Sequence, residues 1–131
     1  MKTALVTGGT RGIGLSTAQK FIDQEWNVYI TSRKDENLEA VLSDNSQLKG
    51  FVARADDLAA ATETCKKIVD ETGTLDVLIN NAGTNPSGGS LLDVDLSAVQ
   101  KTWDVNLMGP LMWTREAVKA GLKESVLNVC S

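Results

Sequence analysis

The chain has 131 residues, of which 42% are hydrophobic and 23% charged, a composition that suits one globular domain over residues 1–131. Its formal net charge is -4 and its 13 lysines and arginines are dispersed, which argues against a nucleic-acid partner. Because no apolar run reaches the roughly 18 to 20 residues of a membrane helix, we expect no membrane association and a cytoplasmic location.

Short apolar runs alternate along the sequence with segments that have the hydrophobic periodicity of helices. This alternation is typical of βαβ units that build a mostly parallel sheet. Short apolar runs predict strands, buried on both faces, over residues 3–7, 27–31, 48–54, 75–80 and 125–130. Helical periodicity predicts helices over residues 12–24, 58–71 and 97–120, and Gly73 and Gly121 stand where helix C-caps belong. Right-handed crossovers then predict a Rossmann-type α/β fold with strand order 3-2-1-4-5 and helices on both faces.

The first predicted strand runs directly into a glycine-rich segment at residues 7–14, Thr-Gly-Gly-Thr-Arg-Gly-Ile-Gly, and a helical pattern follows at once. One glycine permits a tight turn, a second lets backbone N–H groups approach a pyrophosphate, and a third lets the helix pack close to the strand. The start of the helix then favours an anion. A chance glycine-rich turn is the alternative explanation. The candidate cofactor-binding residues here are Gly8, Thr10, Arg11, Gly12, Ile13 and Gly14.

The spacing of these glycines, Thr-Gly-x-x-x-Gly-x-Gly, resembles the cofactor motif of the short-chain dehydrogenases/reductases. The resemblance continues through later segments in the family's order, namely Asp57-Leu58, residues 80–83 (Asn-Asn-Ala-Gly), residues 103–106 (Trp-Asp-Val-Asn) and residues 128–131 (Asn-Val-Cys-Ser). It covers the whole chain. It implies an oxidoreductase that uses a nicotinamide cofactor to interconvert a carbonyl and a secondary alcohol by hydride transfer.

Residues at the end of the second predicted strand bear on the choice of cofactor. An acidic side chain there accepts hydrogen bonds from the ribose 2′-hydroxyl of NAD, whereas an arginine accommodates the 2′-phosphate of NADP. Ser32 and Arg33 favour NADP, and Arg11 adds a second cation. Asp35 and Glu36 leave NAD open as an alternative, and a solvated run of charges would also explain all of these charged residues.

Further roles follow from the resemblance. It implies that Asp57, followed by Leu58, binds the adenine amino group, and that Asn81, Ala82 and Gly83 approach the adenosine ribose. The asparagines of this turn are also expected to tie neighbouring strands together, so a purely architectural role is the alternative.

The family's catalytic residues are an asparagine, a serine, a tyrosine and a lysine. Asn106 matches the asparagine, which in relatives sits at a distortion of the long helix and helps to hold a water molecule. Ser131 matches the serine that orients the substrate carbonyl, with Cys130 replacing the serine before it. The Tyr-x-x-x-Lys pair is expected after Ser131, and the single tyrosine, Tyr29, belongs to a predicted core strand. We therefore expect these residues alone to bind cofactor weakly and to catalyse nothing.

Two interpretations remain open from the sequence. In the first, the residues are the N-terminal part of an NADP-dependent enzyme, truncated after the fifth strand, whose full-length form is a homo-oligomer. In the second, they are a non-catalytic dinucleotide-binding module. Leu107, Met108, Leu111 and Met112 could form half of an oligomer interface, or equally a packed core stripe. The chain has no histidine, and Cys65 and Cys130 lack ligand spacing, so we expect no metal site and two reduced core thiols.

Overall fold

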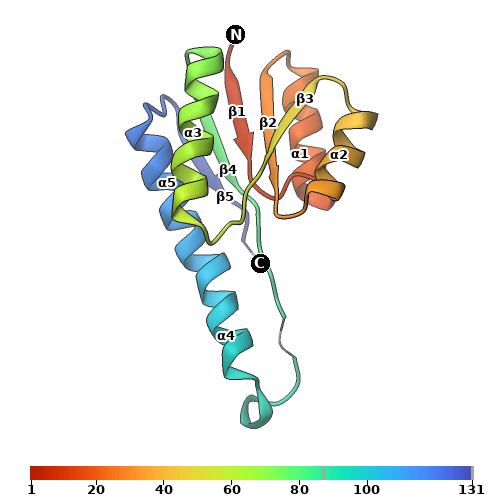
Figure 1. Cartoon of the computed structure of the whole chain (residues 1–131), viewed down its shortest axis with the longest axis vertical. Coiled ribbons are helices and arrows are strands. Elements are labelled where there is room, and N and C mark those ends of the chain that lie inside the picture. Colours follow the sequence, from red (N-terminus) through yellow and green to blue (C-terminus); the bar gives the residue numbers. More distant parts are fainter. Residues whose placement is uncertain (87, 131) are drawn as a thin grey trace.

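The structure is a computed structural model that describes residues 1–86 and 88–130. Its centre is a parallel sheet of five strands in the order β3-β2-β1-β4-β5 (Figure 1). The predicted strand order and the Rossmann-type α/β architecture are confirmed. The strands are β1 (Thr3–Val6), β2 (Asn27–Ser32), β3 (Leu48–Val52), β4 (Val77–Asn80) and β5 (Ser125–Asn128).

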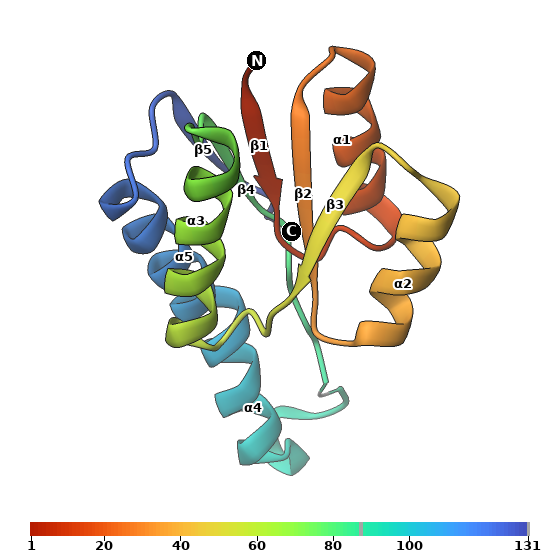
Figure 2. The ribbon, with the colours of Figure 1, turned by 45° about the horizontal axis from the view of Figure 1, so that its top comes forward.

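Helices cover both faces of the sheet (Figure 2). On one face, α1 (Gly12–Asp23) and α2 (Asp35–Asp44) share a hydrophobic cluster with Ala4 and Val6 of β1. On the other face, α3 (Leu58–Thr72) and α5 (Gly109–Lys119) pack around Leu5 of the same strand. Successive side chains of a strand point to opposite faces, so β1 supplies both halves of the core.

The edge strands differ from the prediction of burial on both faces. The central strands β1 and β4 are buried throughout, but most residues of β5 are exposed. The exposed fraction of Leu127 is 54%. The reason is that β5 pairs only with β4 in the described part of the chain, and its Val126 alone packs against a core cluster. Val52 of β3, at the other edge, is also exposed.

Helix α2 is absent from the elements expected from the sequence. Its apolar stripe is short, since Leu38 is its one buried residue, and its periodicity is correspondingly weak. Asp35 and Glu36 form its first turn, where carboxylates interact favourably with the positive end of the helix dipole. Leu38 packs against Gly50 of β3, where a Cβ atom would lie 2.5 Å from the Leu38 Cδ1 atom.

The long helix predicted over residues 97–120 is present as three consecutive segments. Helix α4 (Leu96–Trp103) continues through a π-helical turn, η2 (Asp104–Met108), into α5. Asp95 begins it by accepting a 2.9 Å hydrogen bond from the Ser97 N–H, and its hydrogen bonds with Ser97 lower the pKa of the Asp95 carboxyl. Figure 1 shows α4 and the short 3₁₀ turn η1 (Leu91–Asp93) projecting beyond the sheet.

The prediction of two core thiols is half correct. Cys65 is buried in the α3 side of the core, and burial raises the pKa of its thiol to about 12. Cys130 is exposed, because it follows the edge strand β5 rather than lying within it. Both are free thiols. Gly73 and Gly121 follow α3 and α5 with φ angles of 79° and 104°, as expected of residues that end helices.

Across the described residues, the structure contains no helix that is both long and apolar enough to cross a membrane. The cytoplasmic location stays a prediction.

Candidate nucleotide site

The predicted cofactor residues gather where the carboxyl ends of the strands meet. In a parallel sheet these ends lie along one edge, and the loops that follow β1, β2, β3 and β4 line it (Figure 2). Each loop carries one of the sequence motifs. The fold therefore assembles segments that are up to 75 residues apart in the chain.

The hydroxyl of Thr7 joins the glycine loop to the turn after β4. Its Oγ1 atom accepts hydrogen bonds from the backbone N–H groups of Asn81 and Ala82, each 3.1 Å long. In return, the Asn81 Nδ2 group donates to the carbonyl oxygens of Thr7 at 3.2 Å and Gly8 at 2.9 Å. The two segments thus satisfy each other's polar groups, and neither can move without the other.

Two glycines make this close approach possible. Gly8 has a φ angle of 63°, and a Cβ atom there would lie 2.9 Å from the Ala82 Cα atom. A Cβ atom on Gly14 would overlap the Asn81 Nδ2 atom and lie 2.5 Å from the Gly8 carbonyl oxygen. At Gly8 and Gly14 the glycine spacing read from the sequence therefore has a steric cause, which is contact with the turn that contains Asn81 and Ala82.

The start of α1 is open toward solvent beside this loop. The helix begins at Gly12, and no side chain in the described chain caps it at Arg11. The first N–H groups of an α-helix have no partner within the helix, and together with the helix dipole they favour an anion. Ile13 is exposed and Thr10 is half-buried next to it. An open helix start of this kind can bind an anion such as a phosphate group.

The glycine loop also contacts the end of β2. The Gly9 N–H donates to the Thr31 carbonyl at 3.1 Å, and the Gly8 N–H donates to the Thr31 hydroxyl at 3.2 Å. Arg11 lies two residues after Gly9, and Arg33 lies two residues after Thr31. Both arginines are exposed. The two arginines predicted to bind a 2′-phosphate are thus presented by adjoining loops.

Ser32, the other residue predicted to bind the 2′-phosphate, is buried. Its Oγ atom accepts a 3.2 Å hydrogen bond from the Lys34 N–H and donates to the Lys34 carbonyl at 3.1 Å. The hydroxyl therefore closes the turn that presents Arg33. A direct contact between Ser32 and a ligand stays a prediction.

Asp57 caps helix α3 in the loop that follows β3. Its Oδ1 atom accepts a 3.1 Å hydrogen bond from the Ala60 N–H. Leu58 is the first residue of the helix and is partly exposed. Next to Asp57, the Arg54 guanidinium pairs with Asp56 and lowers the pKa of the Asp56 carboxyl. The adenine contact of Asp57 stays a prediction.

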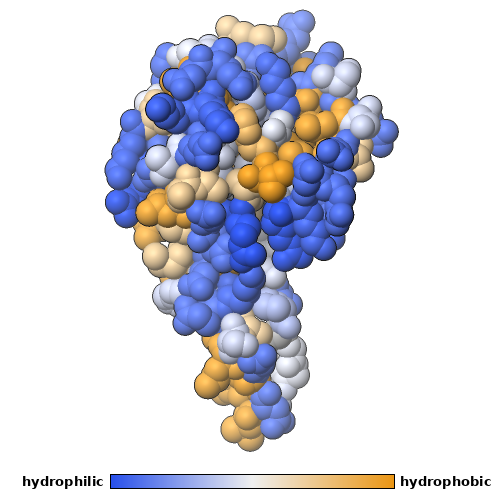
Figure 3. All heavy atoms as spheres, viewed as in Figure 1, coloured by the Kyte–Doolittle hydropathy of each residue, from blue (hydrophilic) through white to orange (hydrophobic). Residues whose placement is uncertain are grey.

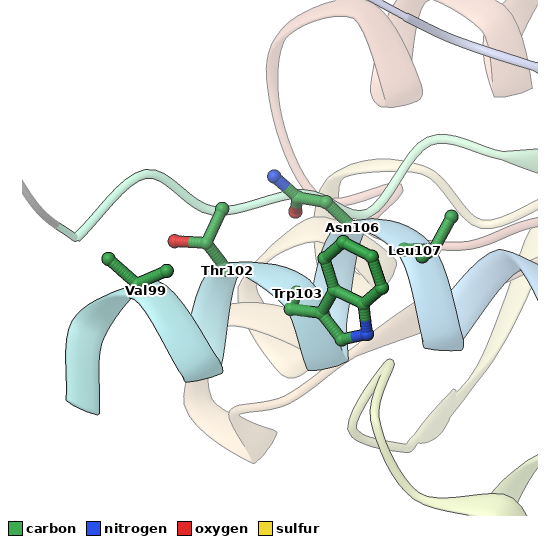
Figure 4. Close-up of a pocket in the computed structure, with 5 residues that line it drawn as sticks. All are labelled: Val99, Thr102, Trp103, Asn106 and Leu107. Atoms are coloured by element: carbon green, nitrogen blue, oxygen red, sulfur yellow. The ribbon is translucent and has the colours of Figure 1, made fainter. Parts of the chain in front are cut away.

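Asn106 lies in the π-helical turn, at the distortion that the family resemblance implies. Its Oδ1 atom accepts from the Thr84 N–H and its Nδ2 group donates to the Thr84 carbonyl, both at 2.8 Å. A Cβ atom on Gly83 would lie 3.5 Å from the Asn106 Oδ1 atom. Asn106 is therefore attached to the same segment as the Asn81 turn. It also lines an open cavity of about 270 Å³ with Val99, Thr102, Trp103 and Leu107 (Figure 4).

Asn80 ties the carboxyl ends of β4 and β5 together, as expected for an asparagine of this turn. Its Nδ2 group donates to the Asn128 Oδ1 atom at 2.9 Å and to the Thr114 hydroxyl at 3.2 Å. This fixes the direction in which the chain leaves β5. Ser131, the predicted substrate-orienting serine, lies outside the described residues.

The single tyrosine is a core residue, as predicted. Tyr29 is 1% exposed and stacks on Phe51, and its hydroxyl donates to Glu71 near the end of α3. That end of α3 leads into the amino end of β4, at the opposite edge of the sheet from the predicted cofactor residues. Burial and the bond to Glu71 raise the pKa of the Tyr29 phenol above its ordinary value.

Three threonines that organise the site were not among the predicted site residues. Thr7, Thr31 and Thr84 each hydrogen-bond a neighbouring loop through the side chain or backbone. For Thr7 and Thr31, the available signal was a polar residue at the end of an otherwise apolar strand. For Thr84 we find no local signal.

Comparisons with known proteins agree on one family. A family model described as short chain dehydrogenase matches residues 2–131. Dehydrogenase/reductase SDR family member 4 of Caenorhabditis elegans is 34% identical over 120 residues, 87% of this chain and 46% of the relative. Glucose 1-dehydrogenase 2 of Bacillus subtilis is 30% identical over 142 residues, 99% of this chain and 54% of the relative.

Solved structures give the same result. ElxO with NADP bound matches with a TM-score of 0.92 at 30% identity, covering 99% of this chain and 55% of that chain. A variant of actinorhodin polyketide ketoreductase with NADPH matches with a TM-score of 0.93 at 27% identity, covering 99% and 53%. The chain thus spans about half the length of each of these four proteins.

Replacing Thr7 tests the junction between the two loops. Thr7→Val removes the hydroxyl and leaves the Asn81 and Ala82 N–H groups without their acceptor, which costs about 1 to 3 kcal/mol per buried group. We expect the free energy of unfolding, measured with urea, to fall by at least about 1 kcal/mol. Thr7→Ser keeps the hydroxyl and should lose less. Equal stability of the valine variant and the parent would contradict the assigned role.

Proposed function

Because the chain belongs to the short-chain dehydrogenase family, whose model matches residues 2–131, we propose that it forms the NADP-binding part of an oxidoreductase. The reaction proposed is interconversion of a carbonyl and a secondary alcohol by hydride transfer. The observation that carries the proposal is the junction of the glycine loop with the Asn81 turn through Thr7, beside the open start of α1. This arrangement leaves backbone N–H groups available to a pyrophosphate.

Two observations support NADP over NAD. Arg11 and Arg33 are exposed on loops that the Gly9–Thr31 hydrogen bond holds together, and a guanidinium makes paired, charge-assisted hydrogen bonds with a phosphate. The similar structures of ElxO and of the ketoreductase contain NADP and NADPH, respectively. The competing acids, Asp35 and Glu36, already have a structural role in the first turn of α2.

Each part of the cofactor would have a place along this edge. We propose that Gly12, Ile13 and Gly14 hold the pyrophosphate, Asp57 the adenine, and Ala82 and Gly83 the adenosine ribose. Asn106, fixed by Thr84, would hold a water molecule near the reacting carbon. The bound cofactor supplies or accepts the hydride.

The proton donor must come from outside these residues. Tyr29 is buried in the middle of β2, its hydroxyl is bonded to Glu71 and its phenol has a raised pKa, so it is not placed to donate to an alkoxide at the carboxyl edge. A Tyr-x-x-x-Lys pair encoded beyond Ser131 would complete an enzyme. If the gene encodes no such pair, the remaining candidate is a non-catalytic dinucleotide-binding module.

We also propose that the full-length protein is a homo-oligomer. Along the continuous helix, Trp103, Leu107 and Leu111 are each about half exposed. Figure 3 shows further apolar surface at the end of the molecule formed by η1 and α4, where Leu91 and Leu92 are almost fully exposed. Met108 and Met112 are partly buried, so the stripe expected from the sequence divides between surface and interior.

Cofactor preference can be tested by removing the guanidinium of Arg33. In the full gene product, Arg33→Ala should weaken NADPH binding at least about tenfold, a loss of about 1.4 kcal/mol, because the 2′-phosphate loses a charged partner. NADH binding should hardly change. Lys34→Ala, which removes the neighbouring exposed cation, is the control and should have the smaller effect in calorimetric titration. Equal losses for NADPH and NADH would argue against the assignment of Arg33.

We expect the 131-residue chain to bind the cofactor without catalysing turnover. Positioned general acids contribute roughly 10² to 10⁴-fold to such reactions, and our proposal identifies none at the carboxyl edge among residues 1–86 and 88–130. We expect purified residues 1–131 to bind NADPH weakly and to reduce no member of a carbonyl panel above background, measured by NADPH absorbance. Robust turnover would show that an acid among these residues has been overlooked.

A further inference from the structure

Two residues of helix α5 converge on one backbone carbonyl in a distant loop. The indole N–H of Trp113 donates a 3.1 Å hydrogen bond to the Ala55 oxygen. One turn earlier in the helix, a Cβ atom on Gly109 would lie 2.8 Å from that same oxygen. Trp113 is 1% exposed, so its N–H needs a partner inside the protein and finds it in Ala55. The carbonyl is thus fixed by a donor and by a close contact at once.

Ala55 lies in the connection between β3 and α3. At the start of this connection, the Ala53 N–H donates to the Ser32 carbonyl at 2.9 Å, next to Arg33. The connection then makes a turn of its own, in which the Asp57 N–H donates to the Arg54 carbonyl at 3.2 Å, and Asp57 caps α3. The attachment through Ala55 is the one that connects the loop to α5, the helix that continues from the π-helical turn containing Asn106.

We propose that Trp113 and Gly109 are positioning residues that place the loop of residues 53–57 against the adenine of the cofactor. The inference rests on the proposed function, because it takes this loop as the adenine side of the site. A small shift of the Ala55 carbonyl would also move Asp57, which is two residues away. Hydrogen bonds weaken steeply as their distance and angle depart from the optimum, so the proposed bond between Asp57 and the adenine would weaken. Neither residue touches the cofactor in this assignment.

The geometry goes beyond the needs of core packing. Trp113 packs in the core cluster between α3, α5 and the sheet, but core packing alone does not require an N–H group that bonds a loop carbonyl. The directed N–H bond and the glycine at position 109 are both required only because the loop approaches the helix so closely. Trp113→Phe removes the donor while keeping an aromatic ring, and Gly109→Ala keeps the donor while pushing the carbonyl away.

The test measures the affinities of three ligands by calorimetry in the full gene product. The ligands are NADPH, adenosine 2′,5′-bisphosphate, which lacks the nicotinamide half, and deamino-NADPH, in which hypoxanthine replaces adenine. For Trp113→Phe we expect NADPH and the bisphosphate to bind about 3- to 10-fold more weakly by the same factor, the range of one net hydrogen bond. The affinity for deamino-NADPH should fall by a smaller factor, because its base lacks the amino group that the loop is proposed to bind.

Trp26→Phe is the matched control, since Trp26 packs edge-on against Phe21 and donates no bond to the cofactor loops among its described contacts. It should leave all three affinities unchanged. Gly109→Ala, made as the second variant, should reproduce the pattern of Trp113→Phe across the ligands.

Unchanged NADPH affinity in folded Trp113→Phe and Gly109→Ala would overturn the positioning role while leaving the proposed function intact. A loss for NADPH that greatly exceeds the loss for the bisphosphate would overturn it too, because the effect would not reside in the adenine half. Failure of the unmodified protein to bind either NADPH or the bisphosphate would instead overturn the proposed function and this inference with it.

Discussion

The Thr7 hydroxyl is the interaction on which the candidate site depends. It accepts from two backbone N–H groups of the turn after β4, while Asn81 donates back to the carbonyls on either side of the strand exit. These groups are partly buried, and a donor that is left unpaired away from water is costly, so the two loops form a single unit. The start of α1 keeps its position because the loop before it is bonded to neighbouring strands rather than free to move.

Other side chains along the carboxyl ends of the strands also form hydrogen bonds with the backbone of another loop. Asn106 bonds Thr84 in both directions, and Trp113 bonds the carbonyl of Ala55. Because α4, the π-helical turn and α5 are continuous, these two contacts come from one long element. That element therefore touches the segment after β4 and the segment after β3, to which the proposed function assigns different parts of the cofactor.

Local patterns were sufficient for much of the fold. The apolar strands reflect a constraint that acts within a few residues, and right-handed crossovers favour the observed strand order. The glycine spacing reflects contact with a turn far along the chain, and it was recognised through its resemblance to a family motif. Helix α2 was not predicted because Leu38 is its one buried residue, so its hydrophobic periodicity was too weak to detect. Cys130 was misplaced because exposure depends on the position of β5 at the sheet edge. The bonds of Thr84 and Trp113 join residues 22 and 58 positions away, and no local pattern encodes them.

The most direct test of the account is to titrate NADPH into the isotopically labelled protein and to follow each backbone amide by NMR. The account predicts that the large shifts gather at residues 8–14, at Arg33 and at residues 81–83, the loops that the Thr7 and Thr31 contacts hold together. Shifts centred instead on the polar hollow between α1 and the end of α2, at Gln19 and Asp44, would contradict it. So would the absence of any shift at saturating NADPH.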